Sequence, residues 1–187
     1  MTERDLPGVI HLEDDNGDMV ALKRIEPHVG VKSLGVITSI DGNECKQLER
    51  MHNFIIQWNT SLNDGKLPHA LNFQAMNTRI TRTLLYPLPA TALNETECAS
   101  LEAKLYRTSL PKCGISEKLP LAIRYASHRF MGLAVPRLHQ HQGLNHLLEF
   151  VKHHLGTSLM AQQIQTSLEL IHTIIGTRSW CFDYPSK

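Results

Sequence analysis

Apolar residues recur at steps of three and four along most of the chain after residue 45. The first such segment would place one apolar stripe on a helix, formed by Leu48, Met51, Ile55, Trp58 and Leu62. An amphipathic helix is stable in water only when that stripe is buried, and several such helices commonly pack around one core. This spacing constrains the chain to a mainly helical fold.

A second helix is expected after Pro68, because Asn63-Asp64-Gly65 ends the first one and proline is favoured at the first helical position. Pro87 and Pro89 would end it, since proline cannot continue a helix. Its expected apolar side consists of Leu71, Ala75, Met76, Ile80, Thr83 and Leu84.

A third helix is indicated by Asn94 and Glu97, which have the spacing of a capping box. Its expected stripe is Cys98, Leu101 and Leu105. Pro111 and Gly114 are expected to interrupt the chain, and a short helix is predicted over 119–126.

Two longer helices are predicted over 137–155 and 158–175, joined at Gly156. Because the join is so short, we expect an antiparallel helical hairpin. The apolar residues at helical spacing are Leu144, Leu147, Leu148, Val151 and Leu155 on the first helix, and Leu159, Ile164, Leu168, Ile171 and Ile175 on the second.

Strand signals precede the helices. Asn16-Gly17 between two strand-like runs predicts a β-hairpin over roughly 9–25, and 31–37 is predicted as a further strand before a turn at 41–43. The predicted fold is therefore mainly α, a helical bundle with a small N-terminal β-hairpin or sheet, and α+β at most. Residues 1–40 would form the β part and residues 41–187 the helical part, with one continuous core.

Composition agrees with a globular protein, since 42% of the 187 residues are hydrophobic and 20% are charged. No apolar stretch approaches the roughly 20 residues that a membrane span needs, and the first fifteen residues contain no secretory apolar region. We therefore expect no membrane association and an intracellular location, in the cytoplasm or nucleus. Four widely spaced cysteines form no CxxC pair and are expected to be reduced thiols.

Three weak catalytic signals have simpler interpretations. Asp14-Asp15 would suit a two-metal polymerase site, but it is followed by a solvated turn and lacks a third carboxylate. The late histidines 139, 141, 146, 153 and 154 have no ligand-plus-base spacing, and Cys113, although next to Lys112, has no evident general base. We expect no catalytic residue, no metal and no cofactor. A small enzyme using the histidines or Cys113 is the weakest alternative.

The middle of the chain is basic. Residues 66–137 contain 10 basic and 4 acidic side chains, a net charge of +6, with Tyr106, Tyr125 and Phe130 among them. Lysine and arginine neutralise phosphates and aromatic rings stack on bases or sugars. The candidate nucleic-acid-binding residues are Arg79, Arg82, Lys104, Arg107, Lys112, Arg124 and Arg129.

Short sequence blocks occur in an order that resembles the reverse transcriptases of retroelements, especially the non-LTR type. Residues 32–36, KSLGV, resemble the "K-x-L-G-V" strand that follows the polymerase palm, and 79–87, RITRTLLYP, resemble the helix that comes next. Residues 110–115, LPKCGI, and 131–138, MGLAVPRL, resemble two later blocks, the second similar to "GGLG-x-P-x-L".

This resemblance implies that residues 20–155 correspond to the thumb and post-thumb region, and that the fingers and palm, with all metal-binding aspartates, are missing before Met1. A thumb packs helices along a template–primer duplex and holds its backbone. The expected function is thus a non-enzymatic nucleic-acid-binding remnant, with DNA or RNA backbone and a complete reverse transcriptase as partners. The alternative is a helical protein-interaction module without a nucleic-acid role.

Overall fold

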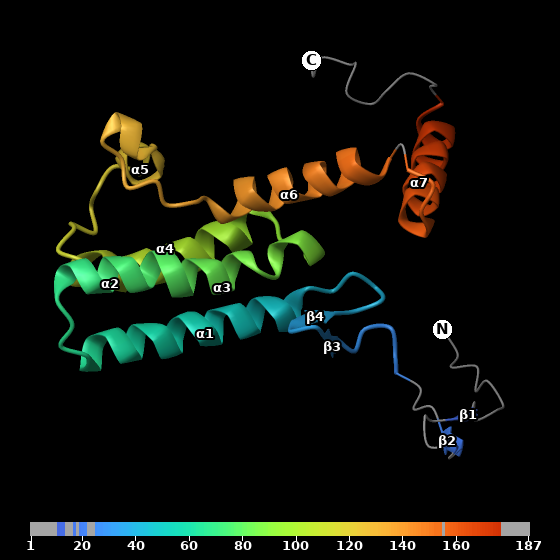
Figure 1. Cartoon of the computed structure of the whole chain (residues 1–187), viewed down its shortest axis with the longest axis horizontal. Helices are drawn as coiled ribbons and strands as arrows, with labels where there is room; N and C mark the ends of the chain where they lie inside the picture. The colour runs from blue at the N-terminus through green and yellow to red at the C-terminus, as the bar shows by residue number, and fades with distance from the viewer. Residues whose placement is uncertain (1–10, 14–16, 18, 22–24, 155, 177–187) are drawn as a thin grey trace. The chain divides into compact units, whose positions relative to one another are not determined.

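The computed structural model describes residues 11–13, 17, 19–21, 25–154 and 156–176. Its contacts divide the chain into two compact units, Met1–Gln47 and Leu48–Lys187. The division falls inside helix α1, Cys45–Asp64, whereas the sequence suggested a change from β to helical structure at residue 40. The chain is mainly helical with small antiparallel β elements near its N-terminus, as predicted (Figure 1).

The predicted N-terminal hairpin is present in the first unit. Strands β1, His11–Glu13, and β2, Met19–Ala21, pair antiparallel with Leu12 opposite Val20. Gly17, in the connection, has a φ of 82°, a left-handed conformation that glycine adopts at little cost. The aspartates of the expected turn, at 14 and 15, lie outside the described residues.

The single strand predicted over 31–37 is wrong, because the chain reverses in its middle. Strands β3, Val31–Ser33, and β4, Val36–Thr38, form a second antiparallel hairpin. Leu34 and Gly35 between them have φ values of 47° and 87°, as a tight two-residue hairpin turn requires. Leucine rarely adopts such a φ, so the Leu-Gly pair did not give the usual Asn-Gly turn signal.

Polar side chains connect this hairpin to the start of α1. The predicted turn at 41–43 is confirmed, since Asp41 Oδ1 accepts a hydrogen bond from the Asn43 backbone at 3.0 Å. Asn43 Oδ1 in turn accepts from the backbone N–H of Cys45, the first residue of α1, at 3.0 Å. Gln47 is buried, and its side-chain oxygen accepts from the Ile37 backbone at 2.8 Å. The second hairpin and the first turn of α1 therefore belong to one unit.

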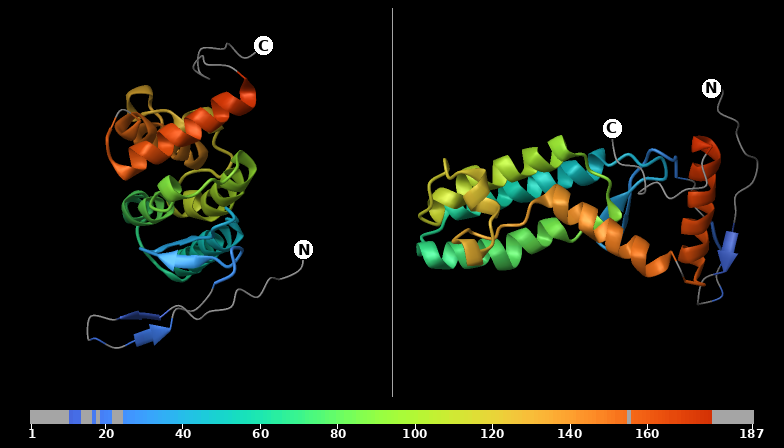
Figure 2. Two further views of the ribbon diagram at one scale, coloured as in Figure 1. Left: turned by 90° about the vertical axis from the view of Figure 1, so that its right-hand side faces the viewer. Right: turned by 90° about the horizontal axis from the view of Figure 1, so that it is seen from above.

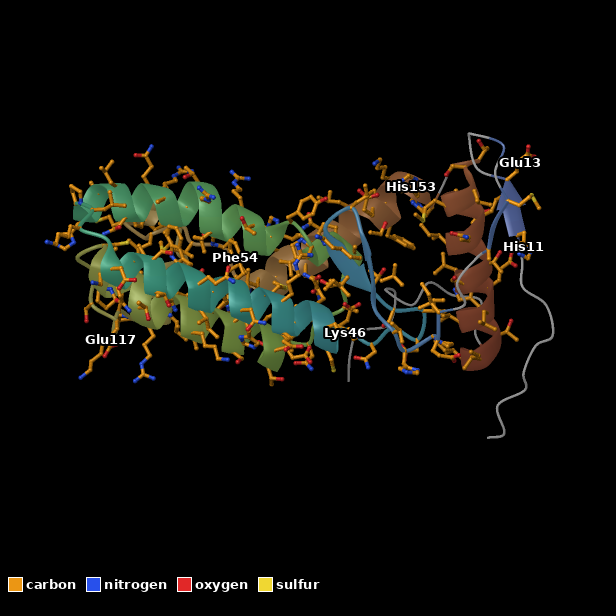
Figure 3. All side chains as sticks on the ribbon, turned by 90° about the horizontal axis from the view of Figure 1, so that it is seen from below. His11, Glu13, Lys46, Phe54, Glu117 and His153 are labelled. Atoms are coloured by element: carbon orange, nitrogen blue, oxygen red, sulfur yellow. The ribbon has the colours of Figure 1, made fainter. Side chains whose placement is uncertain are left out.

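From Leu48 on, α1 belongs to the second unit and lies beside two further helical segments (Figure 2), with side chains between them (Figure 3). Met51, Ile55 and Leu62 of the predicted α1 stripe are buried, and Phe54 is partly buried against the same core. The core consists of Met51, Ile55, Met76, Ile80, Leu84, Leu88, Leu93, Cys98, Leu101, Leu105, Tyr106, Leu110, Cys113, Val135 and Leu138.

The second helical segment contains one wider turn. It runs through α2, His69–Ala75, the π-helical turn η1, Met76–Ile80, and α3, Thr81–Leu85. Its buried positions 72, 76, 80 and 84 repeat every four residues, a step that drifts by about 40° in a 3.6-residue helix. A π turn bonds each residue to the fifth one on and reduces that drift. With the buried side set by these four positions, Leu71 and Thr83 are exposed. Their predicted place on the apolar side of the helix is wrong.

Helix α4, Glu95–Lys112, begins as predicted and ends later than predicted. Asn94 Oδ1 accepts from the Glu97 backbone at 2.8 Å, and Glu97 Oε2 accepts from the Asn94 backbone at 2.9 Å, so the capping box is confirmed. Pro111 does not interrupt the helix but lies inside its last turn. The end comes at Gly114, whose φ of 77° allows the chain to turn away.

The last part of the chain contains α5, Leu121–Tyr125, the short η3, His128–Phe130, α6, Leu138–His153, and α7, Leu159–Ile175. The apolar stripes identified on α6 and α7 are largely exposed. On α6 the buried positions are Leu138 and Gln142, while the predicted residues Leu144, Leu147, Leu148 and Val151 are exposed. Leu159, Ile171 and Ile175 of α7 are exposed too.

Helices α6 and α7 meet near their link rather than along their lengths. Gln165 Nε2 donates to the carbonyl of His154 at 3.2 Å, and the small Ala161 is fully buried close to Gly156. The predicted antiparallel hairpin is not formed, because α7 runs across the end of α6 rather than back along it (Figures 1 and 2). Within the described residues, no helix has the length and apolarity to cross a lipid bilayer.

Candidate nucleic-acid interface

Arg79 and Arg82 lie on the outer side of the second helical segment. Ile80 and Leu84 are buried in the core, which directs the two arginines, both exposed, away from it. Tyr86 follows four residues after Arg82, donates its backbone N–H to the Arg82 carbonyl at 3.0 Å, and is 60% exposed. Two guanidinium groups and an exposed aromatic ring thus occur within eight residues of one helix.

Lys104 and Arg107 are exposed on α4. The carbonyl oxygen of Lys104 accepts a hydrogen bond from Asn59 Nδ2 of α1 at 3.0 Å, which fixes this part of α4 against α1. The Lys104 ammonium is also close enough to influence His52 of α1. Burial of the His52 imidazole lowers its pKa, and the positive charge of Lys104 lowers it further.

Lys112 is held at the C-terminal end of α4 by the start of α2. Its carbonyl oxygen accepts from Asn72 Nδ2 and from His69 Nδ1, each at 2.9 Å. Carbonyls in the last turn of a helix lack partners within the helix, so these side chains satisfy an otherwise unpaired acceptor. Lys112 is partly buried, and two side chains of the described structure anchor its backbone carbonyl.

Arg124 has to be removed from the predicted set, because it lies in the interior. It is 9% exposed, its Nη2 donates to the carbonyl of Glu117 at 3.2 Å, and its guanidinium is 5.3 Å from the centre of the Tyr106 ring. A cation over an aromatic face is stabilised by the ring quadrupole. Arg124 therefore packs α5 against α4 and presents no exposed charge that could bind a phosphate.

A buried carboxylate that the sequence did not single out organises the same region. Glu102 of α4 accepts from the Tyr125 hydroxyl at 2.5 Å and from the Leu138 backbone N–H, the first residue of α6, at 2.6 Å. Arg137 lies over the Tyr125 ring at 5.1 Å. Burial, with the contact to Glu102, raises the pKa of Tyr125 to about 12. Glu102 was recognisable as unusual, because it lies four residues from the buried Cys98 on the same helix face.

A small pocket adjoins this network. It is lined by Glu95, Cys98, Ala99, Glu102, Arg137, His139 and Gln140. Two carboxyl side chains and one guanidinium line it, an environment unsuited to a phosphate. The network therefore helps to hold α6 on the bundle rather than to bind a phosphate.

Arg129 is exposed in η3, next to Phe130, whose ring is 76% exposed. The following residue, Met131, has a φ of 57° and ends this short helical turn. Arg129 and Phe130 therefore form a second place where a cation and an exposed aromatic ring are neighbours, as at Arg82 and Tyr86.

Among the described residues, no ion pair involves the six candidate cations that remain after Arg124 is removed. In the part of the chain that the structure describes, the ion pairs join Glu149 to Lys152 and His153 on α6. None involves the remaining candidates, which are Arg79, Arg82, Lys104, Arg107, Lys112 and Arg129. Arg79 of η1 and Arg82 of α3 form one pair of exposed cations, and Lys104 and Arg107 of α4 form another.

Groups considered for catalysis lie in other surroundings. Burial raises the pKa of the Cys113 thiol and, with nearby Glu102, raises that of Cys98 to about 11, so neither thiol is disposed to form a thiolate. His153 Nε2 is 3.1 Å from Glu149 Oε2, and His154 stacks on Phe150. No cluster of three or more metal-ligating side chains occurs among the described residues.

Comparison with known proteins leaves the resemblance without independent support. No protein-family model, curated protein sequence or solved structure matches the chain. The similarity to reverse transcriptases therefore rests on the short sequence blocks alone and stays a prediction.

Proposed function

We propose that this protein binds the backbone of duplex or hybrid nucleic acid, without sequence preference and without catalysis, as a remnant of a retroelement reverse transcriptase that acts in the cytoplasm or nucleus. The observation that carries the proposal is the set of cations on the segment from 79 to 129 that have no ion-pair partner among the described residues. Unpaired cations keep their full attraction for phosphates.

Rigidity of the supporting helices adds to the argument. Arg79 and Arg82 are on the helical segment whose Ile80 and Leu84 are buried in the core. The backbone carbonyl of Lys104 accepts the hydrogen bond that joins α1 to α4. Cations on such packed helices can meet phosphates at fixed spacing. The adjacent exposed rings of Tyr86 and Phe130 could stack on bases or sugars of unpaired ends.

The test is a fluorescence-anisotropy titration of a random-sequence hybrid at several salt concentrations. The logarithm of affinity should fall linearly with the logarithm of salt, with a slope of about −0.9 for each neutralised phosphate, hence around −3 if three or four cations engage. Replacing Arg79 and Arg82 with Gln should flatten the slope by about 1 to 2.

The matched control removes two charges elsewhere, by Lys32→Gln together with Lys152→Gln, both exposed lysines outside the basic segment. It should leave the slope unchanged. Absence of binding at low salt, or equal losses in the test and control variants, would contradict the proposal.

The alternative function, a helical protein-interaction module, is supported by a different observation. Helices α6 and α7 expose large apolar side chains that a monomeric protein in water would ordinarily bury. The two functions use different surfaces and can coexist. Binding of a protein partner to these apolar side chains would not involve Arg79 or Arg82.

A further inference from the structure

The exposed large apolar side chains of helices α6 and α7 are together called the α6–α7 apolar face. It consists of Leu144, Leu147, Leu148, Val151, Leu159, Met160, Leu170, Ile171, Ile174 and Ile175. These side chains are between 40% and 75% exposed. Core positions elsewhere in the same unit, such as Ile80 and Leu101, are 1% exposed or less.

The size of this face suits a stable dimer. Full burial of one such side chain contributes about 1.5–3 kcal/mol at about 25 cal/mol per Å², which corresponds to roughly 60–120 Å² each. At the observed exposures the face presents roughly 500 Å² of apolar area. A standard interface buries about 800 Å² on each partner, and about 65% of it is apolar in homodimers. The exposed apolar area of this face is therefore about equal to the apolar area, about 520 Å², that each partner buries in such an interface.

The face also lacks the charge that a charged partner would need. Glu169 is the only acidic or basic residue of α7 apart from His172. On α6, Glu149 and Lys152 neutralise each other at 3.7 Å. A phosphate, an acidic peptide or a basic surface would find no opposite charge here. The matching surface is another uncharged pair of apolar helices, and each further copy of this chain brings one.

Residue spacing fits helix-to-helix packing. Leu144, Leu147, Leu148 and Val151 follow the i, i+3, i+4, i+7 pattern, and Ile171, Ile174 and Ile175 repeat its first part on α7. Side chains with this spacing on one helix insert between those of a facing helix. We propose that two copies of the protein associate through their α6–α7 apolar faces, each face contacting the same face of the other copy about a two-fold axis.

Sedimentation equilibrium of the full chain, free of nucleic acid and at micromolar concentration, tests this proposal. The expected mass is about twice the 21.1 kDa of one chain. Leu147→Glu combined with Ile174→Glu should weaken association at least about 100-fold, because each carboxylate would be buried without a partner in the interface. The matched control, His146→Glu with Gln162→Glu, adds the same charges at exposed positions outside the face and should remain dimeric.

A milder variant guards against a folding defect. Leu148→Gln with Leu170→Gln removes apolar area without adding charge, and should also weaken association while circular dichroism remains unchanged. A monomeric wild-type chain, or a dimer that persists in both face variants, would overturn the proposal. Because no nucleic acid is present, either result leaves the proposed function of the basic residues untouched.

Discussion

Two regions of the second unit show the same apolar spacing and opposite burial. In the bundle of α1 to α4, the residues at helical spacing are buried, as Ile55, Ile80 and Leu101 show with 1% exposure or less. On α6 and α7, residues at the same spacing, such as Leu148 and Ile174, are 63% and 75% exposed. Apolar periodicity thus predicted helices in both regions, but most residues at that spacing are buried only in the bundle.

The difference arises from what lies opposite each stripe. Each bundle helix packs against other helices of the bundle. Side-chain hydrogen bonds, such as the one from Asn72 of α2 to the Lys112 carbonyl of α4, fix how these helices pack. Helix α6 contacts the bundle through Leu138 and Gln142, and Gln142 is bound to the backbone N–H and carbonyl of Leu93. A helix presents one side to each neighbour, and no neighbour among the described residues covers the stripe formed by Leu144, Leu147, Leu148 and Val151.

The largest expected effect tests the comparison directly. Ile80→Ala should reduce the free energy of unfolding by about 2–5 kcal/mol, through lost burial and a residual cavity. Leu148→Ala removes a similar side chain at an exposed position and should change it by less than about 0.5 kcal/mol in the monomer. Urea denaturation at low protein concentration measures both. Equal losses would show that the two regions do not differ in packing.

A smaller effect is expected at the junction between the regions. Tyr125→Phe removes the hydroxyl that donates to Glu102 and should cost about 1.5–3 kcal/mol, as for a hydrogen bond to a charged group. Glu102→Gln keeps an acceptor for the Leu138 N–H and should cost no more. Thermal unfolding of both variants checks the ranking. If neither is destabilised, the Glu102 hydrogen bonds do not help to hold α6 on the bundle, and the Gln142 hydrogen bonds and apolar contacts do.

Protonation of His52 should produce a pH-dependent effect confined to the bundle. Its pKa is lowered in the folded protein by burial and by Lys104, so the unfolded chain binds the proton more readily. Stability is therefore highest above pH 6.5, the ordinary value, and declines as the pH falls below it toward the lowered pKa. His52→Gln should remove this part of the decline in unfolding curves taken from pH 7.5 to about 5.

Lys104→Gln provides a second measurement of the same coupling. It removes one of the two causes of the lowered pKa, so NMR titration of His52 should show a higher pKa and the loss of stability below pH 6.5 should shrink. An unchanged His52 titration in this variant would mean that burial alone acts on the imidazole.

The smallest effect is expected for the exposed arginines. Arg79→Ala should change the free energy of unfolding by less than about 0.5 kcal/mol, because its side chain is exposed and has no ion-pair partner among the described residues. Arg124→Ala should be clearly more destabilising, since it removes a buried guanidinium from the Tyr106 ring. A reversal of this order would contradict the separation of binding and packing arginines.

Local signals in the sequence were sufficient for much of the fold. The capping box of Asn94 and Glu97, the hairpin around Gly17 and the stripe of α1 depend on residues close in sequence, and all three were predicted. The prediction that Pro111 interrupts the chain was wrong. A proline in the last turn removes one backbone hydrogen bond, and α4 continues through Pro111 without it. The strand predicted over 31–37 failed because its turn uses leucine at a position where asparagine is usual.

By itself, the sequence determined where helices form, because propensity, capping and apolar spacing act between residues a few positions apart. Only the tertiary structure decided which stripe is buried, that Arg124 packs on Tyr106 while Arg79 stays exposed, and that Glu102 caps α6. Those outcomes depend on contacts between residues far apart in the chain. A charged side chain has the same identity in the sequence whether it meets solvent, an aromatic ring or a helix end, so its environment could not be predicted from spacing alone.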